Sequence, residues 1–120
     1  MAQQSKYLFI ASMDVNLNKK DLFNEVYDSE HCPELSNVPG VGLITRFQKQ
    51  KFAVLIGGET RTVVVESEPT YHAMYEIDSP EVLTSAAWGE AVERGRWPEQ
   101  VRPYTKNRRH VLLERIYPGS

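Results

Sequence analysis

The sequence has a single cysteine, Cys32, and no long run of apolar residues. One cysteine cannot form a disulfide within the chain, and such low usage is typical of the reducing cytoplasm. No segment approaches the roughly 20 consecutive apolar residues that a membrane-spanning helix needs. The first residues, Met1 to Lys6, lack the apolar segment of a secretory signal peptide. These absences predict a cytoplasmic protein that does not enter a membrane.

The chain also lacks an excess of positive charge, because 14 Lys and Arg face 16 Asp and Glu, for a formal net charge of -2. Binding to nucleic acid or to an anionic membrane depends on many uncompensated cations, so we expect neither partner. The three histidines are far apart, with no His-x-x-x-His or Cys-x-x-Cys spacing, so we expect no metal site. Gly57-Gly58 is not followed by the Lys-Ser/Thr pair of a phosphate-binding loop.

The hydrophobic pattern predicts one domain over 1–120, built from strands and helices. Apolar runs or period-two alternation predict strands over 6–15, 41–51, 70–77 and 110–117. One helix is expected from an Asn18 cap to about Ser29, and Pro33 should prevent it from continuing. A second helix is expected from a Ser79 cap to Gly95.

These elements follow the order β-α-β, arm, β-α-β, which is the pattern of a ferredoxin-like α+β fold: a βαββαβ antiparallel sheet with helices on one face. The arm over 52–68 is either a hairpin that turns at Gly57-Gly58 or a long flexible loop. Both faces of the strands are apolar, as Leu8 and Ile10 alternate with Tyr7 and Phe9. Because helices cover only one face, we expect a second copy to cover the other in a homodimer.

Two stretches carry a family resemblance. Glu30-His31-Cys32-Pro33 is followed by Val38-Pro39-Gly40-Val41 and a strand containing Arg46, and Tyr71-His72-Ala73-Met74-Tyr75-Glu76-Ile77-Asp78-Ser79 leads into the second helix. With these stretches, most of the chain except the arm resembles the dimeric α+β barrel superfamily, and within it EthD-type domains. EthD domains usually enter the third strand through an aromatic-Asp-Gly motif, in place of which this chain has Tyr71-His72-Ala73.

The resemblance implies a dimeric α+β barrel with a cavity between sheet and helices, which in this superfamily usually takes a small aromatic or polyketide-like compound. Relatives include cofactor-free monooxygenases, polyketide cyclases, isomerases, lyases and haem proteins, so the fold alone does not decide the reaction. We expect no cofactor, although His110 on the last strand could be an axial ligand in a haem-binding relative.

His31 and His72 are predicted to be catalytic because an imidazole titrates near neutral pH and can act as acid or base. His31 is expected past a helix C-terminus, where the dipole favours its charged form, although its ring could instead only cap that helix. His72 shares a strand face with Met74 and Glu76, which is either a cavity lining or a solvent-facing or dimer-facing side. Cys32 has no acidic orienting partner and is not expected to be a nucleophile.

Trp88, Trp97 and Tyr104 lie around the second helix and its exit, where they either stack on a flat substrate or close the core. Arg46 or Glu76 is expected to orient a polar group of that substrate. Half of the 14 cations lie near the C-terminus: Arg94, Arg96, Arg102, Lys106, Arg108, Arg109 and Arg115. They form a solvated face or a set of dimer salt bridges, or they steer an anionic substrate to the pocket.

The leading hypothesis is therefore an enzyme that performs cofactor-free acid–base chemistry, such as cyclisation, isomerisation, elimination or oxygenation, on a hydrophobic aromatic or polyketide-like metabolite. His31 would move the proton and His72 would assist. The alternative is a non-catalytic dimeric module that binds a small ligand or takes part in a stress response. The enzyme hypothesis gains if His31 and His72 line one enclosed cavity.

Overall fold

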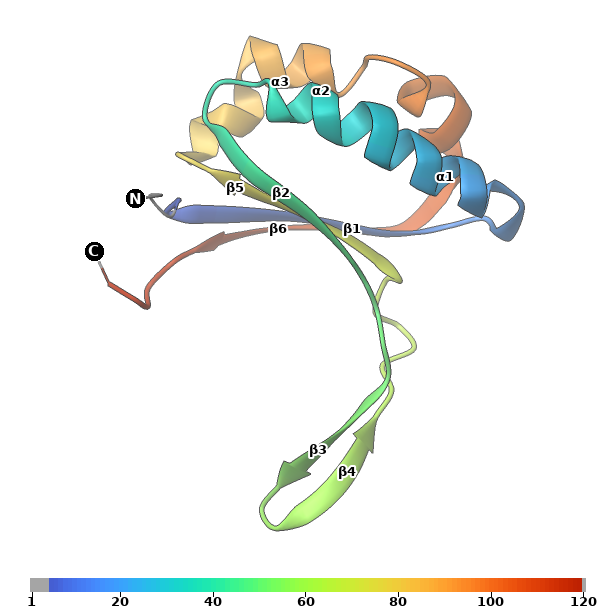
Figure 1. Cartoon of the computed structure of the whole chain (residues 1–120), viewed down its shortest axis with the longest axis vertical. Helices are drawn as coiled ribbons and strands as arrows, with labels where there is room; N and C mark the ends of the chain where they lie inside the picture. The colour runs from blue at the N-terminus through green and yellow to red at the C-terminus, as the bar shows by residue number, and fades with distance from the viewer. Residues whose placement is uncertain (1–4, 120) are drawn as a thin grey trace.

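The computed structural model describes residues 5–119, so residues 1–4, part of the start read above as free of a signal peptide, and Ser120 lie outside it. One antiparallel sheet has the order β2-β5-β1-β6. Its strands are β1 (Tyr7–Val15), β2 (Val41–Gln48), β5 (Tyr71–Ile77) and β6 (Thr105–Glu114). The helices lie on one face of this sheet (Figure 1), so the predicted ferredoxin-like α+β fold is confirmed. Within 5–119, no helix is long and apolar enough to cross a membrane.

Of the two alternatives for the arm over 52–68, the structure shows the hairpin. Strands β3 (Phe52–Ile56) and β4 (Glu59–Val63) pair with each other and with no other strand among the described residues. Gly57 and Gly58 both have positive φ, which makes glycine the natural residue for this tight turn. Figure 1 shows the hairpin projecting from the sheet on the side away from the helices. A two-stranded hairpin without further strands is only marginally stable in water, and no other described strand pairs with this arm.

The first helix does not end before Pro33, and this prediction was wrong. It runs without a break through η1 (Leu17–Lys19), α1 (Lys20–Val26), the π-helical turn η2 (Tyr27–His31) and α2 (Cys32–Ser36). At the π turn the Cys32 N–H donates to the Tyr27 carbonyl, five residues back. Pro33, which has no N–H to donate, lies in the first turn of α2, and the helix continues to Ser36. Asn18 is likewise not the cap, because it lies inside η1 and Asn16 precedes that turn.

The second helix is shorter than predicted and is broken at Ser85. It consists of η3 (Pro80–Thr84) and α3 (Ala86–Ala91), and the extended backbone of Ser85 separates them. The Ser85 hydroxyl accepts the Trp88 N–H at 3.2 Å and donates to the Val82 carbonyl at 2.7 Å. Ser79, the predicted cap, makes no side-chain cap bond. The side-chain oxygen that fixes the start of α3 is therefore six residues further along.

After α3, the chain forms the turns η4 (Trp97–Val101) and η5 (Arg102–Tyr104). Strand β6 then begins at Thr105, five residues before the predicted start at His110. Asn107 has a positive φ of 51° close to a register shift opposite Ser12 and Asp14. Arg108 follows this irregularity and lies on the same face of β6 as His110, two residues later.

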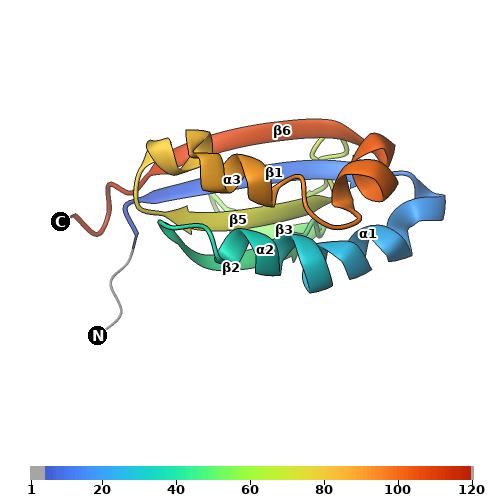
Figure 2. The same ribbon diagram turned by 90° about the horizontal axis from the view of Figure 1, so that it is seen from above.

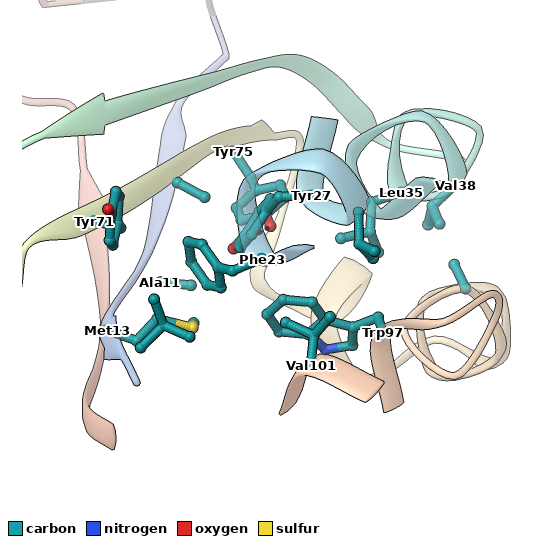
Figure 3. Close-up of a cluster of buried hydrophobic side chains, with 14 of the residues drawn as sticks. Ala11, Met13, Phe23, Tyr27, Leu35, Val38, Tyr71, Tyr75, Trp97 and Val101 are labelled. Carbon is teal, nitrogen blue, oxygen red and sulfur yellow. Dashed lines mark hydrogen bonds between the residues drawn. The ribbon is translucent and has the colours of Figure 1, made fainter. Parts of the chain in front are cut away.

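The core lies between the sheet and the helical layer. In β5, Tyr71, Ala73, Tyr75 and Ile77 are buried and alternate with half-buried residues, which agrees with the period-two alternation that predicted this strand. From the first helix Phe23, Tyr27 and Leu35 pack onto this face, and Trp97 and Val101 of η4 complete the cluster in Figure 3. In Figure 2, α1 and α2 lie on the β2 side of the layer and α3 on the β6 side.

The opposite face of the sheet carries the remaining apolar residues. Strand register places Leu8 beside Leu113, and Ile10 between Met74 and Val111. At the edges of this face Leu43 is 64% exposed, Phe47 50% and Leu113 47%. No described helix covers it (Figure 1). The fold thus leaves a broad apolar surface where the sequence predicted one.

Candidate functional site

A cavity of about 180 Å³ lies between the helix-covered face of the sheet and the helical layer. Strands β1, β5 and β6 line it from below, the first helix lines one side, and α3 with η4 and η5 lines the other. The lining residues are Phe9, Ala11, Met13, Tyr27, His31, Leu35, Tyr75, Trp88, Val92, Trp97, Arg102, Arg108 and His110. Its walls are therefore mostly aromatic and aliphatic, with guanidinium, imidazole and phenol groups as the polar ones.

His31 lies on the π turn of the first helix and is only 6% exposed. Its ring stacks on Trp97, with centroids 4.3 Å apart and planes inclined by 21°, and meets the edge of Tyr27 at 5.1 Å. Its Nδ1 atom is buried without a hydrogen-bond partner. No neighbour therefore fixes the tautomer through that nitrogen. Single π turns within helices occur frequently at functional sites.

The charge state of His31 is the reverse of the predicted one. Burial, followed by the positive charges of Arg102 and Arg108, lowers the pKa of His31 to about 4. The helix dipole does not compensate, because the helix continues past His31 to Ser36 instead of ending before it. At neutral pH the cavity therefore contains an uncharged imidazole that can accept a proton.

Two phenols stand next to this imidazole. The hydroxyl oxygens of Tyr27 and Tyr75 are 3.3 Å apart, and both residues are buried. Burial raises the pKa of Tyr27 to about 12 and that of Tyr75 well above its usual value, so both stay protonated. One hydroxyl donates to the other, which leaves the second hydroxyl hydrogen for another acceptor. The pair can thus offer a neutral hydrogen-bond donor at the base of the cavity.

The cations of the cavity differ in their partners. Arg102 donates two hydrogen bonds to Glu93, at 2.7 and 2.8 Å, so its charge is compensated. Arg108 forms no ion pair or hydrogen bond with the residues of the described chain, 5–119. Beside it, His110 stacks on Phe9 with centroids 5.7 Å apart, and burial with the charge of Arg108 lowers the pKa of His110.

The structure brings only three of the seven predicted site residues together: His31, Trp88 and Trp97. His72 lies on the opposite face of the sheet, paired in register with Ser12. Its Nε2 bonds to the Pro69 carbonyl at 3.0 Å and its Nδ1 to the Ser12 hydroxyl at 2.7 Å. His72 is therefore held by the sheet itself and does not share the cavity of His31.

Arg46 connects β2 to the first helix. It donates to Asp28 at 2.7 Å and to Asn24 at 2.8 Å, and its guanidinium carbon lies 4.4 Å from the centre of the Tyr27 ring. These contacts hold the guanidinium between β2 and the first helix, and Arg46 does not line the cavity of His31. Cys32 next to the site has its pKa raised to about 11 by burial, so it is a thiol and not a thiolate nucleophile.

Glu76 and Tyr104 also lie outside the cavity. Glu76 is on the open face of the sheet, in a shallow hollow of about 510 Å³ with Tyr7 and Leu113. Although this hollow is larger, its lining contains no histidine, so it is not the candidate site. Tyr104 is exposed, with the Lys19 ammonium 4.5 Å from the centre of its ring.

Arg108, Tyr27 and Tyr75 line the cavity although the sequence did not single them out for it. For Tyr27 and Tyr75, nothing in the sequence distinguishes a buried phenol beside a cavity from one in a solid core. Arg108 could have been found, because it precedes His110 by two residues and shares its parity if β6 is extended backwards. Among residues 5–119 no cluster of His, Cys, Asp or Glu could hold a metal ion.

No protein-family model matches the chain, and no curated protein matches it in sequence. A protein from Nitrosomonas europaea assigned as an antibiotic biosynthesis monooxygenase aligns over 100% of both chains, with a TM-score of 0.55 and 16% identity. A mutant of MhuD with two manganese protoporphyrin IX molecules per active site covers 95% of this chain and 98% of its own, at a TM-score of 0.56 and 12% identity. The haem degrader MhuD from Mycobacterium tuberculosis, with two haems in its active site, covers 95% of this chain and 99% of its own, at a TM-score of 0.52 and 15% identity.

These likenesses show a shared fold, and the bound porphyrins pose the question of whether this cavity fits a haem. At about 180 Å³ it is smaller than the roughly 300–1,000 Å³ of pockets for drug-sized ligands, and a porphyrin is larger than most such ligands. In this form the cavity does not fit a haem.

Proposed function

We propose that this chain is a small-molecule enzyme that transfers a proton to and from a flat, hydrophobic ligand without a bound cofactor, and that His31 is the base. The observation that carries the proposal is the uncharged, buried imidazole on the wall of an aromatic cavity, with an unpaired ring nitrogen. An imidazole in this state can take a proton from an activated C–H or O–H bond and later return it. The Trp88 and Trp97 rings would hold the ligand.

Proton abstraction is the step shared by the reactions predicted from the sequence. Isomerisation returns the proton at another atom, elimination expels a leaving group, and cyclisation uses the resulting carbanion as a nucleophile. Oxygenation requires that carbanion to react with molecular oxygen, and the monooxygenase assignment of the Nitrosomonas neighbour supports this outcome. The EthD-type resemblance of the sequence implies a ligand cavity between sheet and helices, which supports this location for the ligand. Since His72 is on the other face, His31 would act without it within one subunit.

A generic proton-abstraction probe tests the proposal before any natural substrate is known. The flat aromatic compound 5-nitrobenzisoxazole loses its C–H proton to a base while its N–O bond breaks, and the phenolate formed is coloured. We expect the protein to accelerate this reaction, and His31→Gln to reduce the rate by about 10². His72→Gln is the matched control and should retain the rate. Retention of the rate by His31→Gln would remove His31 from the mechanism.

The alternative function is a module that binds a small ligand without reaction. One observation favours it: a base is most effective when its pKa lies near the working pH, and the pKa of His31 is about 4. Binding of flat aromatic compounds without any acceleration of the probe reaction would identify this alternative. Either function uses the same cavity, so ligand binding is common to both.

We also propose that the chain is a homodimer that packs through the open face of the sheet. The exposed side chains of Leu43, Phe47 and Leu113 on that face support this arrangement, because large exposed apolar patches mark interaction sites. The β3–β4 hairpin projects on the same side, with Phe52 and Leu55 exposed. It could therefore lie along the second copy and bury part of its own apolar surface.

A further inference from the structure

The rim of the cavity holds a positive charge that no carboxylate of the described chain compensates. Arg102 is paired with Glu93, but Arg108 has no such partner within 5–119. Register places His110 opposite Ala11, so Arg108, two residues earlier on β6, lies on the same helix-facing side of the sheet. Both side chains line the cavity, next to the aromatic walls formed by Phe9 and Trp88.

We propose that the cavity takes a small planar carboxylate, aromatic or conjugated, whose carboxylate is bound by Arg108 at the rim and whose flat part lies among Phe9, Trp88 and Trp97. This inference rests on the proposed function for the location of the ligand and adds its chemical class. A guanidinium binds a carboxylate through two parallel N–H···O hydrogen bonds, and this geometry suits a ligand that is flat throughout.

The balance of charge favours a carboxylate over a phosphate. A phosphate dianion gains most where several cations or backbone N–H groups converge, whereas this rim offers one uncompensated guanidinium. The two imidazoles add no charge, because the pKa values of both His31 and His110 are lowered. A monoanion therefore matches the site. The free hydroxyl hydrogen of the Tyr27–Tyr75 pair would serve an oxygen at the far end of the ligand.

A bound carboxylate would also change the base. The charges of Arg102 and Arg108 are part of the reason why the pKa of His31 is low. A carboxylate on Arg108 would offset that positive field and raise the pKa of His31 towards neutral pH, because a nearby anion favours the charged imidazole. The ligand would thus make its own base stronger.

Benzoate and benzamide test this inference, because they have nearly the same flat shape and differ in charge. Binding can be followed by tryptophan fluorescence, since both tryptophans of the chain line the cavity. We expect benzoate to bind at least tenfold more tightly than benzamide. Arg108→Gln should abolish that preference while leaving benzamide binding unchanged. Arg94→Gln is the matched control: it removes one charge from an ion pair with Glu34 outside the cavity and should keep the preference.

The outcomes separate this inference from the proposed function. If benzoate and benzamide bind equally, the carboxylate assignment is wrong, while the aromatic cavity and His31 remain. If Arg108→Gln keeps the preference for benzoate, Arg108 is not the residue that binds the anion, and the inference fails. A second readout is the pKa of His31, measured by NMR, which should rise when benzoate saturates the protein and stay unchanged with benzamide.

Discussion

The imidazole of His31 lies face to face with the indole of Trp97, with ring centroids 4.3 Å apart. This contact joins the π turn of the first helix to η4, two segments whose stacked residues are 66 positions apart in the sequence and both line the cavity. It also isolates the imidazole from water. Trp97 is therefore responsible for part of the burial that keeps His31 uncharged.

The first prediction concerns stability against pH. His31 has a pKa of about 4 in the folded chain and about 6.5 when unfolded, so below pH 6.5 the unfolded chain takes up a proton that the folded chain refuses. The contribution of His31 is complete above pH 6.5 and is lost as the pH falls towards 4. At pH 5 the loss should be about 2 kcal/mol relative to pH 7.5. Urea unfolding at both pH values measures it.

His31→Phe is the control for this prediction, because it retains an aromatic ring against Trp97 but cannot titrate. The change in unfolding free energy between pH 7.5 and pH 5 should be smaller in this variant by the amount assigned to His31. Comparing differences between two pH values cancels any effect of the substitution on packing. An identical pH dependence in the two proteins would show that His31 is accessible to protons in the folded state.

The second prediction concerns Arg46, which the sequence assigned to substrate binding. Its hydrogen bonds to Asn24 and Asp28 and its position over the Tyr27 ring make it a connection between β2 and the first helix. Arg46→Ala should lower the free energy of unfolding by about 2–3 kcal/mol, and Arg46→Lys by less, since lysine keeps the charge but not the planar fork. Chemical denaturation provides the measurement. Unchanged stability together with weaker binding of benzamide would restore the ligand-binding assignment.

The fold could be predicted because the strands carry their own periodicity. In β5, the residues from Tyr71 to Ile77 alternate with period two in the sequence, and buried positions alternate with half-buried ones in the structure. The elements whose bounds were predicted wrongly depend on local hydrogen bonds that the sequence pattern does not indicate. Pro33 does not end the first helix because a π turn precedes it, and Ser85 starts α3 because its hydroxyl reaches both Val82 and Trp88.

The candidate site was only partly predictable for a different reason. Alternation assigned His72, Met74 and Glu76 to one face of a strand, but it cannot tell which face the helices cover. That choice depends on the handedness of the crossover connections and on how all four strands are ordered. Arg108 was missed because the start of β6 follows from an irregular pairing near Asn107 rather than from a hydrophobic pattern.

The third prediction compares two glycines. Gly95 has a φ of +69°, and a Cβ atom there would lie 2.5 Å from Oε1 of Glu30. That oxygen accepts the backbone N–H of Arg96 at 2.9 Å, so Glu30 cannot move without losing this bond. Gly95→Ala should therefore destabilise the fold by about 1–3 kcal/mol. Gly89→Ala is the control: it lies in α3 with nothing within 4 Å of a new Cβ, and it should stabilise by about 0.5–1 kcal/mol. Thermal unfolding of the two variants gives the comparison.

The fourth prediction concerns the proposed homodimer. Phe47 is half exposed on the open face of the sheet, next to His72 in register, where a second copy would cover it. Phe47→Glu would place a carboxylate in that contact, and the cost of burying an unpaired charge should make the variant a monomer at micromolar concentration. Leu17→Glu introduces the same charge at a position that is 90% exposed, in the first turn η1 of the helical layer, and should remain a dimer.

Analytical ultracentrifugation of the wild type and these two variants measures the masses directly. The control matters because both substitutions change the net charge and remove an exposed apolar side chain, so a difference between them reports the location and not the chemistry. A wild type that sediments as a single subunit would contradict the dimer. A Phe47→Glu variant that stays dimeric would move the contact elsewhere, and the exposed hairpin residues Phe52 and Leu55 would then be the next surface to test.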